Sequence, residues 1–413
     1  MKSGMKLRSQ PWLVVALLSF VGCLNYLDRT MITTMHSSLT SAMPMTNAQF
    51  GLLTSVFLWV YGLFSPVAGF LADKFSRSRV IIISLMVWSV VTWLTAFSTS
   101  FKYLLVTRAL MGISEACYYP AALALIADYH RGYTRSFATA IHEIGVSVGA
   151  SLGFLGGMIA TNHHWSTAFS VFGTVGTAYA LLLSLLLRDP PAKDDKAVEH
   201  PAEKVRFFEA IKALFSERSF MLMVIFYGLL GIVGWMILGW LPTYYKEHFN
   251  LSETMAGVYA TGYLYPASLV GVLAGGFIAD RWMRRNKRAR ILVPVIGLCI
   301  AAPCMFMAGY TTVLIIAIPF FMVYAFTRGF TDANLMPVLC MVADPRYRAT
   351  GYGVLNMFSC IVGGLSLYAG GLLRDAKIDL SVIYQTAALI MVLCALLFFM
   401  IKPKFVNPEN KSV

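Results

Sequence analysis

The stretch Gly69-Phe70-Leu71-Ala72-Asp73-Lys74 recurs half a chain later as Gly276-Phe277-Ile278-Ala279-Asp280-Arg281. Each copy stands at the end of an apolar run and is followed by a cluster of basic residues. The two copies lie 207 positions apart in a chain of 413 residues, so the offset indicates an internal duplication. Parallel repeats of this kind are typical of membrane proteins whose two halves pack around a central cavity.

A second pair of segments repeats at nearly the same offset. Arg135 opens a glycine-rich segment that ends in Gly156-Gly157, and Arg348 opens another that ends in Gly370-Gly371. Both pairs therefore predict one helical unit that is used twice in the same orientation.

A polar stretch separates the two units. Asp189-Pro190-Pro191 ends the apolar run before it, because a pair of prolines cannot continue a helix. We therefore expect a first bundle over residues 1–188, a linker over 189–218 and a second bundle over 219–413. Apolar residues between 205 and 215 fall near one helical face, which predicts a short helix that either lies on the membrane surface or is simply solvated.

The composition indicates whether the two units are surrounded by water or by lipid. Hydrophobic residues make up 58% of the chain and charged residues only 13%, too few to cover the surface of a soluble protein. A soluble enzyme and a nucleic-acid-binding domain are thereby excluded. About 20 apolar residues cross a bilayer as a helix, so we expect an all-α membrane protein with twelve transmembrane helices in two six-helix bundles. The expected spans are residues 12–34, 48–73, 79–99, 103–128, 135–161, 165–187, 219–245, 254–281, 291–309, 312–341, 350–373 and 380–401.

The Lys and Arg residues set the orientation of these spans. Of the 33, we count 26 on the side of the N-terminus, four on the opposite side and three within spans. Cytoplasmic loops carry such an excess of basic residues, so we expect both termini in the cytoplasm and the chain in the plasma (inner) membrane. The net charge of +13 therefore reflects topology and indicates no nucleic-acid partner.

The first repeated stretch extends into the pattern Gly69-x-x-x-Asp73-Lys74-x-x-Arg77-x-Arg79. With its echo at Gly276–Asp280, this pattern resembles the signature loop of the major facilitator superfamily, and the likeness in architecture covers nearly the whole chain. An acid that faces a basic residue or a helix N-terminus can hold two halves together in one state and release them in another. The residues expected to act in conformational gating are Gly69, Asp73, Arg77, Arg79 and Asp280. The alternative is that they are solvated loop residues.

Three further motifs resemble one branch of that superfamily, the anion:cation symporters, which include sugar-acid transporters and sialin-like carriers. The motifs are Asn25-Tyr26-Leu27-Asp28-Arg29, Arg108-x-x-x-Gly112-x-x-Glu115 and Trp240-Leu241-Pro242-Thr243-Tyr244. The spinster-type lipid transporters also carry an Asn-Tyr-x-Asp-Arg segment and the glutamate of the second motif. The third motif favours organic anions as substrates.

Charged residues within the spans are the candidates for function. Burying one costs at least about 2.5–3.5 kcal/mol, so each requires a partner or a role. An arginine binds a carboxylate through two hydrogen bonds, whereas a desolvated carboxyl group can carry a proton. The seven charged residues within the spans are Asp28, Arg29, Arg108, Glu115, Glu143, Arg328 and Asp332.

The resemblance implies roles for four of these residues. Asp28 and Glu115 would bind and release protons, and Arg29 and Arg108 would bind the substrate anion or pair with those acids. Because Arg108 and Glu115 stand seven positions apart, they share a helix face and lie about 10 Å apart along the axis. The alternative is a set of structural ion pairs that joins the first and fourth helices.

Further substrate contacts are expected from the fifth and eleventh helices. Glu143 aligns by the internal repeat with Asn356, so the two can face the cavity from opposite halves, and His142 stands beside Glu143 as a further candidate. Glu143 can equally be a third proton site, a partner for a substrate amine, or a partner of a basic residue such as Arg135.

The tenth helix and several tyrosines complete the expected site. Arg328 either binds substrate from the second half or forms an i,i+4 salt bridge with Asp332. Tyr26 and Tyr263 are expected to contact substrate, although tyrosines in such spans also serve as packing or interfacial residues.

Together these patterns predict a secondary transporter that imports a small organic anion, such as a hexuronate, an aldonate or a sialic acid, by proton symport with alternating access. The alternative is a spinster-like, proton-coupled carrier of lysolipids or other amphipathic lipids. No nucleophile, metal-binding or phosphate-binding pattern indicates an enzyme, and we expect no cofactor besides the proton gradient. The expected partners are the anion, protons and the lipid bilayer, and we expect a monomer.

Overall fold

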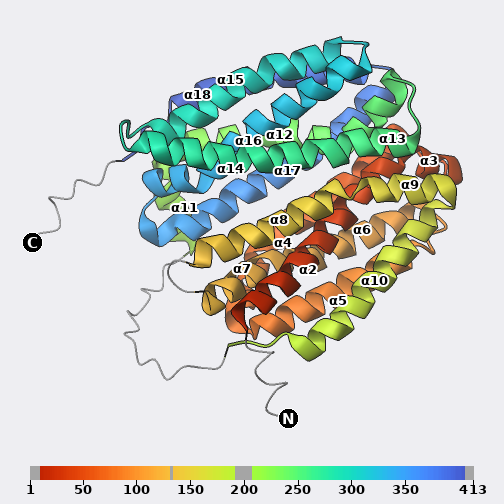
Figure 1. Ribbon diagram of the computed structural model, residues 1–413, viewed down its shortest axis with the longest axis horizontal. Helices are drawn as coiled ribbons and strands as arrows, with labels where there is room; N and C mark the ends of the chain where they lie inside the picture. Colours follow the sequence, from red (N-terminus) through yellow and green to blue (C-terminus); the bar gives the residue numbers. More distant parts are fainter. Residues whose placement is uncertain (1–9, 131–133, 191–206, 405–413) are drawn as a thin grey trace, which may run out of the picture.

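The computed structural model describes residues 10–130, 134–190 and 207–404. Every regular element in these ranges is helical, and twelve helical stretches are long and apolar enough to cross a membrane. The predicted all-α fold with twelve spans is therefore confirmed. Figure 1 shows the helices in two groups that lie side by side, one coloured red to yellow-green and the other green to blue.

The first group contains six spans, of which the first, fourth and fifth are interrupted. The first span passes through a short 3-10 turn at Ile32–Met35, and the fourth breaks at Cys117. The second span begins at a capping box, in which the side chains of Thr46 and Gln49 each accept a hydrogen bond from the backbone N–H of the other residue. The helices of this group are α2 (Pro11–Met31), α3 (His36–Ala42), α4 (Asn47–Lys74), α5 (Arg77–Thr95), α6 (Phe101–Ala116), α7 (Tyr118–Tyr129), α8 (Arg135–Ser151), α9 (Phe154–Asn162) and α10 (Trp165–Leu186).

The second group repeats the six-span plan, but its first, fourth and fifth spans are unbroken and its second span is irregular. Its second span contains a π-helical turn at Val258–Tyr263, which inserts an extra residue into the helical repeat. The helices of this group are α12 (Arg218–His248), α13 (Glu253–Gly257), α14 (Leu264–Met283), α15 (Ala289–Tyr310), α16 (Leu314–Val342), α17 (Arg348–Asp375) and α18 (Leu380–Phe399).

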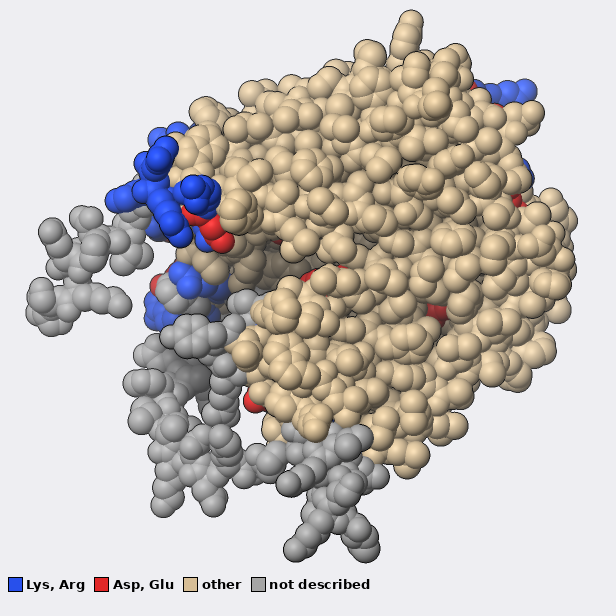
Figure 2. All heavy atoms as spheres, in the orientation of Figure 1, with Lys and Arg blue, Asp and Glu red and all other residues tan. Residues whose placement is uncertain are grey.

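The surface of the molecule matches a bilayer in the middle and water at one end. Large apolar side chains point outward from the spans, such as Ile315 at 79% exposure and Leu389 at 66%. Figure 2 shows Lys and Arg gathered at one end, which we call the basic end and define by the exposed Arg281, Arg284 and Arg285 at the end of α14 and just beyond it. The opposite end, around α3 and α13, is called the far end.

The two halves close on each other toward the far end along α4 and α17. Glycines allow this contact, because a Cβ at Gly51 would lie 2.5 Å from the carbonyl oxygen of Leu367. A Cβ at Gly371 would likewise lie 2.3 Å from the carbonyl oxygen of Asn47. Backbone therefore packs directly on backbone, which is the arrangement that small residues permit between membrane helices.

Two carboxylates of the second half reinforce this closure. Asp375 accepts hydrogen bonds from the backbone N–H groups of Asn47 and Ala48, each at 2.9 Å, where α4 begins. Glu253 accepts from the backbone N–H groups of Ser37 and Ser38, at 2.9 and 3.1 Å, where α3 begins. Helix N-termini attract negative charge because their first N–H groups lack partners within the helix.

The halves separate toward the basic end. Contact between α4 and α17 extends as far as Gly62, where a Cβ would meet the Cβ of Cys360 at 2.9 Å. Farther along, a Cβ added at Gly69 of α4 or at Gly353 of α17 would have no neighbouring atom within 4 Å among the described residues, so open space lies beside both glycines. Figure 2 shows acidic atoms in the groove that separates the halves. The structure is thus open at the basic end and closed at the far end.

The linker contributes one described helix, α11 (Phe207–Ser216). Its Leu214 is only 2% exposed, and Phe215 packs edge-on against Phe220 of α12 at 5.6 Å between ring centroids. A helix was predicted here, and its apolar face docks on the second half at the basic end. The predicted boundaries at 188 and 218 stay predictions, and residues 191–206 of the linker lie outside the described part of the chain.

Candidate functional site

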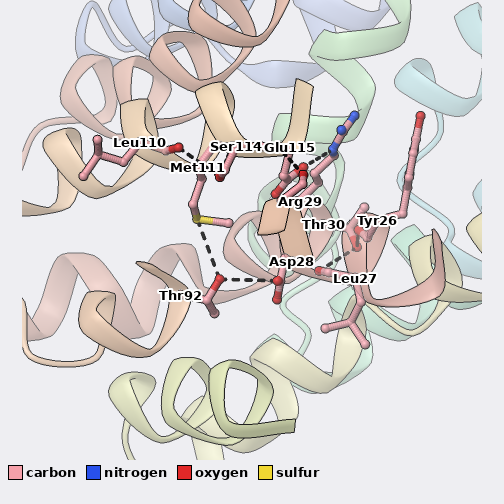
Figure 3. Close-up of polar contacts among 11 residues, drawn as sticks. Tyr26, Leu27, Asp28, Arg29, Thr30, Thr92, Leu110, Met111, Ser114 and Glu115 are labelled. Atoms are coloured by element: carbon pink, nitrogen blue, oxygen red, sulfur yellow. Dashed lines mark hydrogen bonds and ion pairs between the residues drawn. The ribbon is translucent and has the colours of Figure 1, made fainter. Parts of the chain in front are cut away.

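A buried ion pair joins the first and fourth spans. Arg29 Nε on α2 donates to Glu115 Oε2 on α6 at 2.6 Å, and the two side chains are 5% and 0% exposed. The guanidinium also lies over the rings of Tyr61 and Tyr26, 4.4 and 4.8 Å from their centroids. Figure 3 shows Arg29 and Glu115 facing each other across the two helices. The positive charge is therefore stabilised by a carboxylate and by two aromatic faces.

Asp28, beside Arg29 on α2, points to a different neighbour. Its carboxylate accepts a hydrogen bond from Thr92 Oγ1 on α5 at 3.3 Å, and the residue is only 4% exposed (Figure 3). Among the described residues no Lys or Arg forms an ion pair with it, although Arg108 lies within electrostatic reach. An unpaired buried carboxylate is costly, and uptake of a proton removes that cost.

Arg108 on α6 is buried with unused hydrogen-bond donors. It is 2% exposed, and its Nε and Nη2 atoms have no hydrogen-bond partner in the described structure. Its guanidinium lies 5.4 Å from the ring centroid of Phe169 and within electrostatic reach of Asp28 and Glu115. Buried polar groups are almost always satisfied in proteins, so these open donors mark a place where a ligand can bind.

Arg29 and Arg108 face the same cavity. It is a small cavity of about 20 Å³ that lies between the halves, just inside the closure at the far end. Polar walls come from the two arginines, Thr33 and Thr54, and the remaining walls are mostly apolar. The apolar lining residues are Ile32, Phe57, Leu58, Trp235, Leu238, Gly239 and Leu367.

Glu143 on α8 lies at the edge of the open groove. Its side chain is 39% exposed, and Oε1 accepts a hydrogen bond from the hydroxyl of Tyr119. His142 is fully buried behind it, with Nε2 2.7 Å from the hydroxyl of Tyr118 and Nδ1 3.6 Å from Glu143 Oε1. The predicted contact of His142 with substrate is therefore not available in this conformation.

The second half contributes a charged pair on α16. Arg328 Nη1 donates to Asp332 Oδ2 at 3.4 Å, which is the i,i+4 pair that the spacing allows. The two side chains are nevertheless 26% and 37% exposed, so the pair also reaches the space between the halves. Tyr227, Tyr265 and Tyr324 lie within electrostatic reach of Arg328.

The remaining predicted contacts, Tyr263 and Asn356, differ in how far the structure exposes them. Tyr263 is 44% exposed and packs against Tyr259 at 5.6 Å, whereas Tyr265 lies within electrostatic reach of Tyr26. Asn356 on α17 is half-buried, and Tyr352, one turn before it, lies within electrostatic reach of Glu143.

Sequence reasoning missed two residues of the site, Thr92 and Tyr61. The sequence does contain an indication of Thr92. Together with Ser84 and Thr95 it forms a row of small polar residues along an otherwise apolar span. Tyr61 stands in an apolar run, and only the structure shows that its ring lies against the Arg29 guanidinium, 4.4 Å from the centroid.

The predicted gating residues form contacts within their own halves. Arg77 of α5 donates to Asp128 of α7, and Arg290 of α15 donates to Asp280 of α14 at 2.7 Å. Arg79 is exposed, and the side chain of Asp73 lies outside the described part of the chain. A latch between the halves at the basic end stays a prediction for the opposite conformation.

Two similar groups of six membrane spans, closed on each other at one end and lined by buried charges, define a multi-pass membrane transporter. The chain belongs to the Major Facilitator Superfamily, whose family model matches residues 18–367. Members of this family are transporters and not enzymes.

Relatives of two kinds are similar over most of the chain. Protein spinster homolog 1 of Xenopus tropicalis is 26% identical over 381 residues, which cover 88% of this chain and 72% of that protein. The probable sulfoacetate transporter SauU of Cupriavidus necator is 27% identical over 434 residues, covering 100% of this chain and 98% of that protein. The crystal structure of a bacterial homolog of the human lysosomal transporter Spinster, inward-facing and unoccupied, matches with a TM-score of 0.76 at 23% identity, covering 94% of this chain and 95% of that chain.

Proposed function

We propose that this protein is a secondary active transporter that imports a small organic anion together with protons. The observation that carries the proposal is Arg108, a buried guanidinium with open donors, beside the Arg29–Glu115 pair. An arginine remains charged and fits a carboxylate or sulfonate. The positive-inside rule assigns the basic end to the cytoplasm, so the conformation described here is open to the cytoplasm. We place both termini there and the monomeric chain in the plasma (inner) membrane.

Coupling follows from competition for Arg29. While Glu115 is ionised, it occupies the Nε donor of Arg29. A proton on Glu115 removes its charge and frees the guanidinium for the substrate anion, so anion and proton bind more favourably together than either does alone. Asp28, which forms no ion pair within the described part of the chain, is the second proton site.

The other polar groups around the groove position the rest of the substrate. We assign contacts to Tyr26 and Glu143 from the first half and to Arg328, Tyr263 and Asn356 from the second. His142 acts from behind Glu143. Because these groups lie on both halves, a substrate with polar groups at both ends draws the halves together.

Reconstituted protein tests the proposal directly. Proteoliposomes with an inward proton gradient are given labelled hexuronate, aldonate, sialic acid and sulfoacetate, and at least one is expected to accumulate. Uptake of none of these anions would overturn the proposal. Asp28→Asn and Glu115→Gln are each expected to abolish gradient-driven uptake while some exchange of internal for external substrate remains. Lys102→Gln, an exposed change on α6, serves as the control and should transport normally.

A second candidate is a proton-coupled carrier of amphipathic lipids. It is favoured by the similarity to spinster proteins and by the mostly apolar cavity lining, including Phe57, Trp235 and Leu367. Thermal-shift measurements on purified protein with sugar acids, sulfonates and lysolipids separate the candidates. Stabilisation by lysolipids alone would favour the second candidate.

A further inference from the structure

One histidine is enclosed in the closure at the far end. His36 begins α3 in the first half and is only 9% exposed. Its ring packs edge-on against Phe50 of α4 and Trp240 of α12, at 4.6 and 5.8 Å between centroids. Phe50 and Trp240 contact each other as well, at 5.8 Å. Because Trp240 belongs to the second half, this group of three rings exists only while the far end is closed.

The imidazole of His36 is buried without a hydrogen bond. Neither Nδ1 nor Nε2 has a hydrogen-bond partner among the described residues. The side-chain amide of Asn47 is within reach of the ring, but it already donates to Asp375 at 3.0 Å and accepts from Arg374 at 3.4 Å. Burying a charge without a partner costs far more than burying an uncharged polar group, so this site favours the neutral imidazole.

The positive charges around the ring strengthen that preference. Lys246 of α12 and Arg374 of α17, both in the second half, lie within electrostatic reach of His36. His248, a further titratable group at the end of α12, is turned away toward the backbone of Thr311, 3.2 Å from its carbonyl oxygen. An imidazolium at His36 would therefore be repelled by two cations while the far end is closed.

The carboxylates on the elements around α3 are engaged with other groups. Glu253 of α13 bonds the backbone N–H groups that begin α3, and Asp375 of α17 bonds those that begin α4. Glu247 of α12 pairs with Arg374 at 2.6 Å. α9, which also contacts α3, carries no titratable side chain. Among the described residues, no carboxylate forms an ion pair with His36 that would stabilise its charged form.

We propose that His36 is a pH sensor of the far-end closure: the closed conformation requires its neutral imidazole, and protonation of this imidazole opens the far end. Opening carries Trp240 and Arg374 away with the second half, so the ring meets water, where an imidazole takes up a proton near pH 6.5, roughly. The open conformation then binds this proton more tightly than the closed one, and a falling pH shifts the population toward it. The inference requires only that the halves open at the far end, whatever the substrate.

Distances between spin labels measure this opening in lipid nanodiscs, without substrate or proton gradient. The labels are placed on Lys102→Cys and Thr312→Cys, exposed positions at the far end of opposite halves, in a cysteine-free background. Between pH 7.5 and 5.5 the ratio of open to closed protein should rise about tenfold, because the imidazole in water titrates near pH 6.5 whereas Asp375 and Glu253, as carboxylates, titrate near about 4. A ratio that stays constant over this range would overturn the proposal.

Two substitutions of His36 test whether its charge causes the opening. His36→Gln is neutral at every pH and should remain as closed at pH 5.5 as at 7.5, whereas His36→Lys carries a lasting positive charge and should favour the open form at both. His164→Gln, which replaces an exposed histidine at the same end, is the matched control and should keep the wild-type response. A wild-type response in His36→Gln, a closed His36→Lys or a lost response in His164→Gln would each contradict the assignment to His36.

Discussion

Arg108 combines a high cost of burial with two donor atoms that have no hydrogen-bond partner among the residues the structure describes. A residue retained only for stability would use those donors. Removing one partner of a buried ion pair is strongly destabilising, but Arg108 forms no such pair among the described residues, so its replacement breaks none. A substitution of Arg108 should therefore change substrate binding without lowering the stability of the fold.

We expect Arg108→Met to keep or raise the melting temperature and to weaken anion binding. Each lost hydrogen bond to a charged group is worth about 1.5–3 kcal/mol, so affinity should fall by roughly 10- to 100-fold or more. Thermal unfolding and substrate titration of the same preparation check both expectations. A fall in melting temperature that accompanies the loss of binding would indicate a structural role instead.

At the scale of elements, Asp189 anchors the start of α5. Its carboxylate accepts from the backbone N–H and the hydroxyl of Ser78, at 2.9 and 2.8 Å, and from the hydroxyl of Ser76. Partial burial alone would raise the pKa of Asp189, but the hydrogen bonds from Ser76 and Ser78 outweigh it and lower this pKa below its ordinary value. The contact therefore stabilises the folded protein most where the carboxylate is ionised.

Asp189→Ala should consequently destabilise the protein at neutral pH by about 1 kcal/mol, the usual cost of losing a helix cap. Because the folded pKa is depressed, this stabilisation is fully present above the unfolded pKa and is lost as the pH falls through the folded pKa. Melting temperatures of wild-type and variant protein should converge in acid. A difference that persists in strongly acidic buffer would contradict the prediction.

The seam between α4 and α17 is a second feature at this scale. A Cβ at Gly371 would meet the backbone of Asn47 and Ala48, which cannot move aside as a side chain can. Gly371→Ala should therefore hinder closure at the far end and shift the population toward the opposite conformation. Gly353→Ala is the matched control on the same helix, because open space surrounds that position.

Thiol labelling measures this shift. Thr54 lines the cavity just inside the closure, so Thr54→Cys in a cysteine-free background reports access from the far end. We expect labelling by a membrane-impermeant reagent to rise several-fold with Gly371→Ala and to stay constant with Gly353→Ala. Equal labelling in both variants would show that the seam does not control access.

For the whole molecule, the sequence predicts the spans and the duplication well, because both depend on long apolar runs and on a repeat that survives at a fixed offset. It predicts the site less well. Whether Arg29 meets Glu115 depends on how α2 and α6 are rotated about their axes. Packing against other helices sets each rotation, as where Gly112 of α6 lies against the backbone of Phe57 on α4. No local pattern around either residue records it.

Tyr263 illustrates a second limit. An unbroken α-helix places residues two positions apart about 200° apart around the axis, so predicting either Tyr263 or Tyr265 as a cavity residue requires the correct helical phase. The π-helical turn at Val258–Tyr263 inserts a residue and shifts that phase. Single-sequence periodicity cannot detect the shift, so it cannot predict that Tyr265 lies within electrostatic reach of Tyr26 and Arg328.

Ionic strength should change the balance between the two conformations of the whole molecule. The contacts of Asp375 and Glu253 with helix N-termini are electrostatic and partly exposed, so salt screens them. Labelling of Thr54→Cys from the far end is expected to increase with salt. In the double variant Asp375→Asn, Glu253→Gln, salt should increase the labelling less than it does in the protein with both carboxylates. An equal increase in the two proteins would contradict the prediction.

The two halves also differ in how easily a single mutation can weaken the closure at the far end. The second half contributes carboxylate side chains, which a single codon change removes. The first half contributes mainly the backbone N–H groups of Ser37, Ser38, Asn47 and Ala48, and adds only the Ser38 hydroxyl and the Asn47 amide as side-chain donors. Nearly every amino acid carries such an N–H group, and proline alone lacks it. Substitutions that loosen these contacts should therefore arise mainly in the second half, even though the chain as a whole is a duplication.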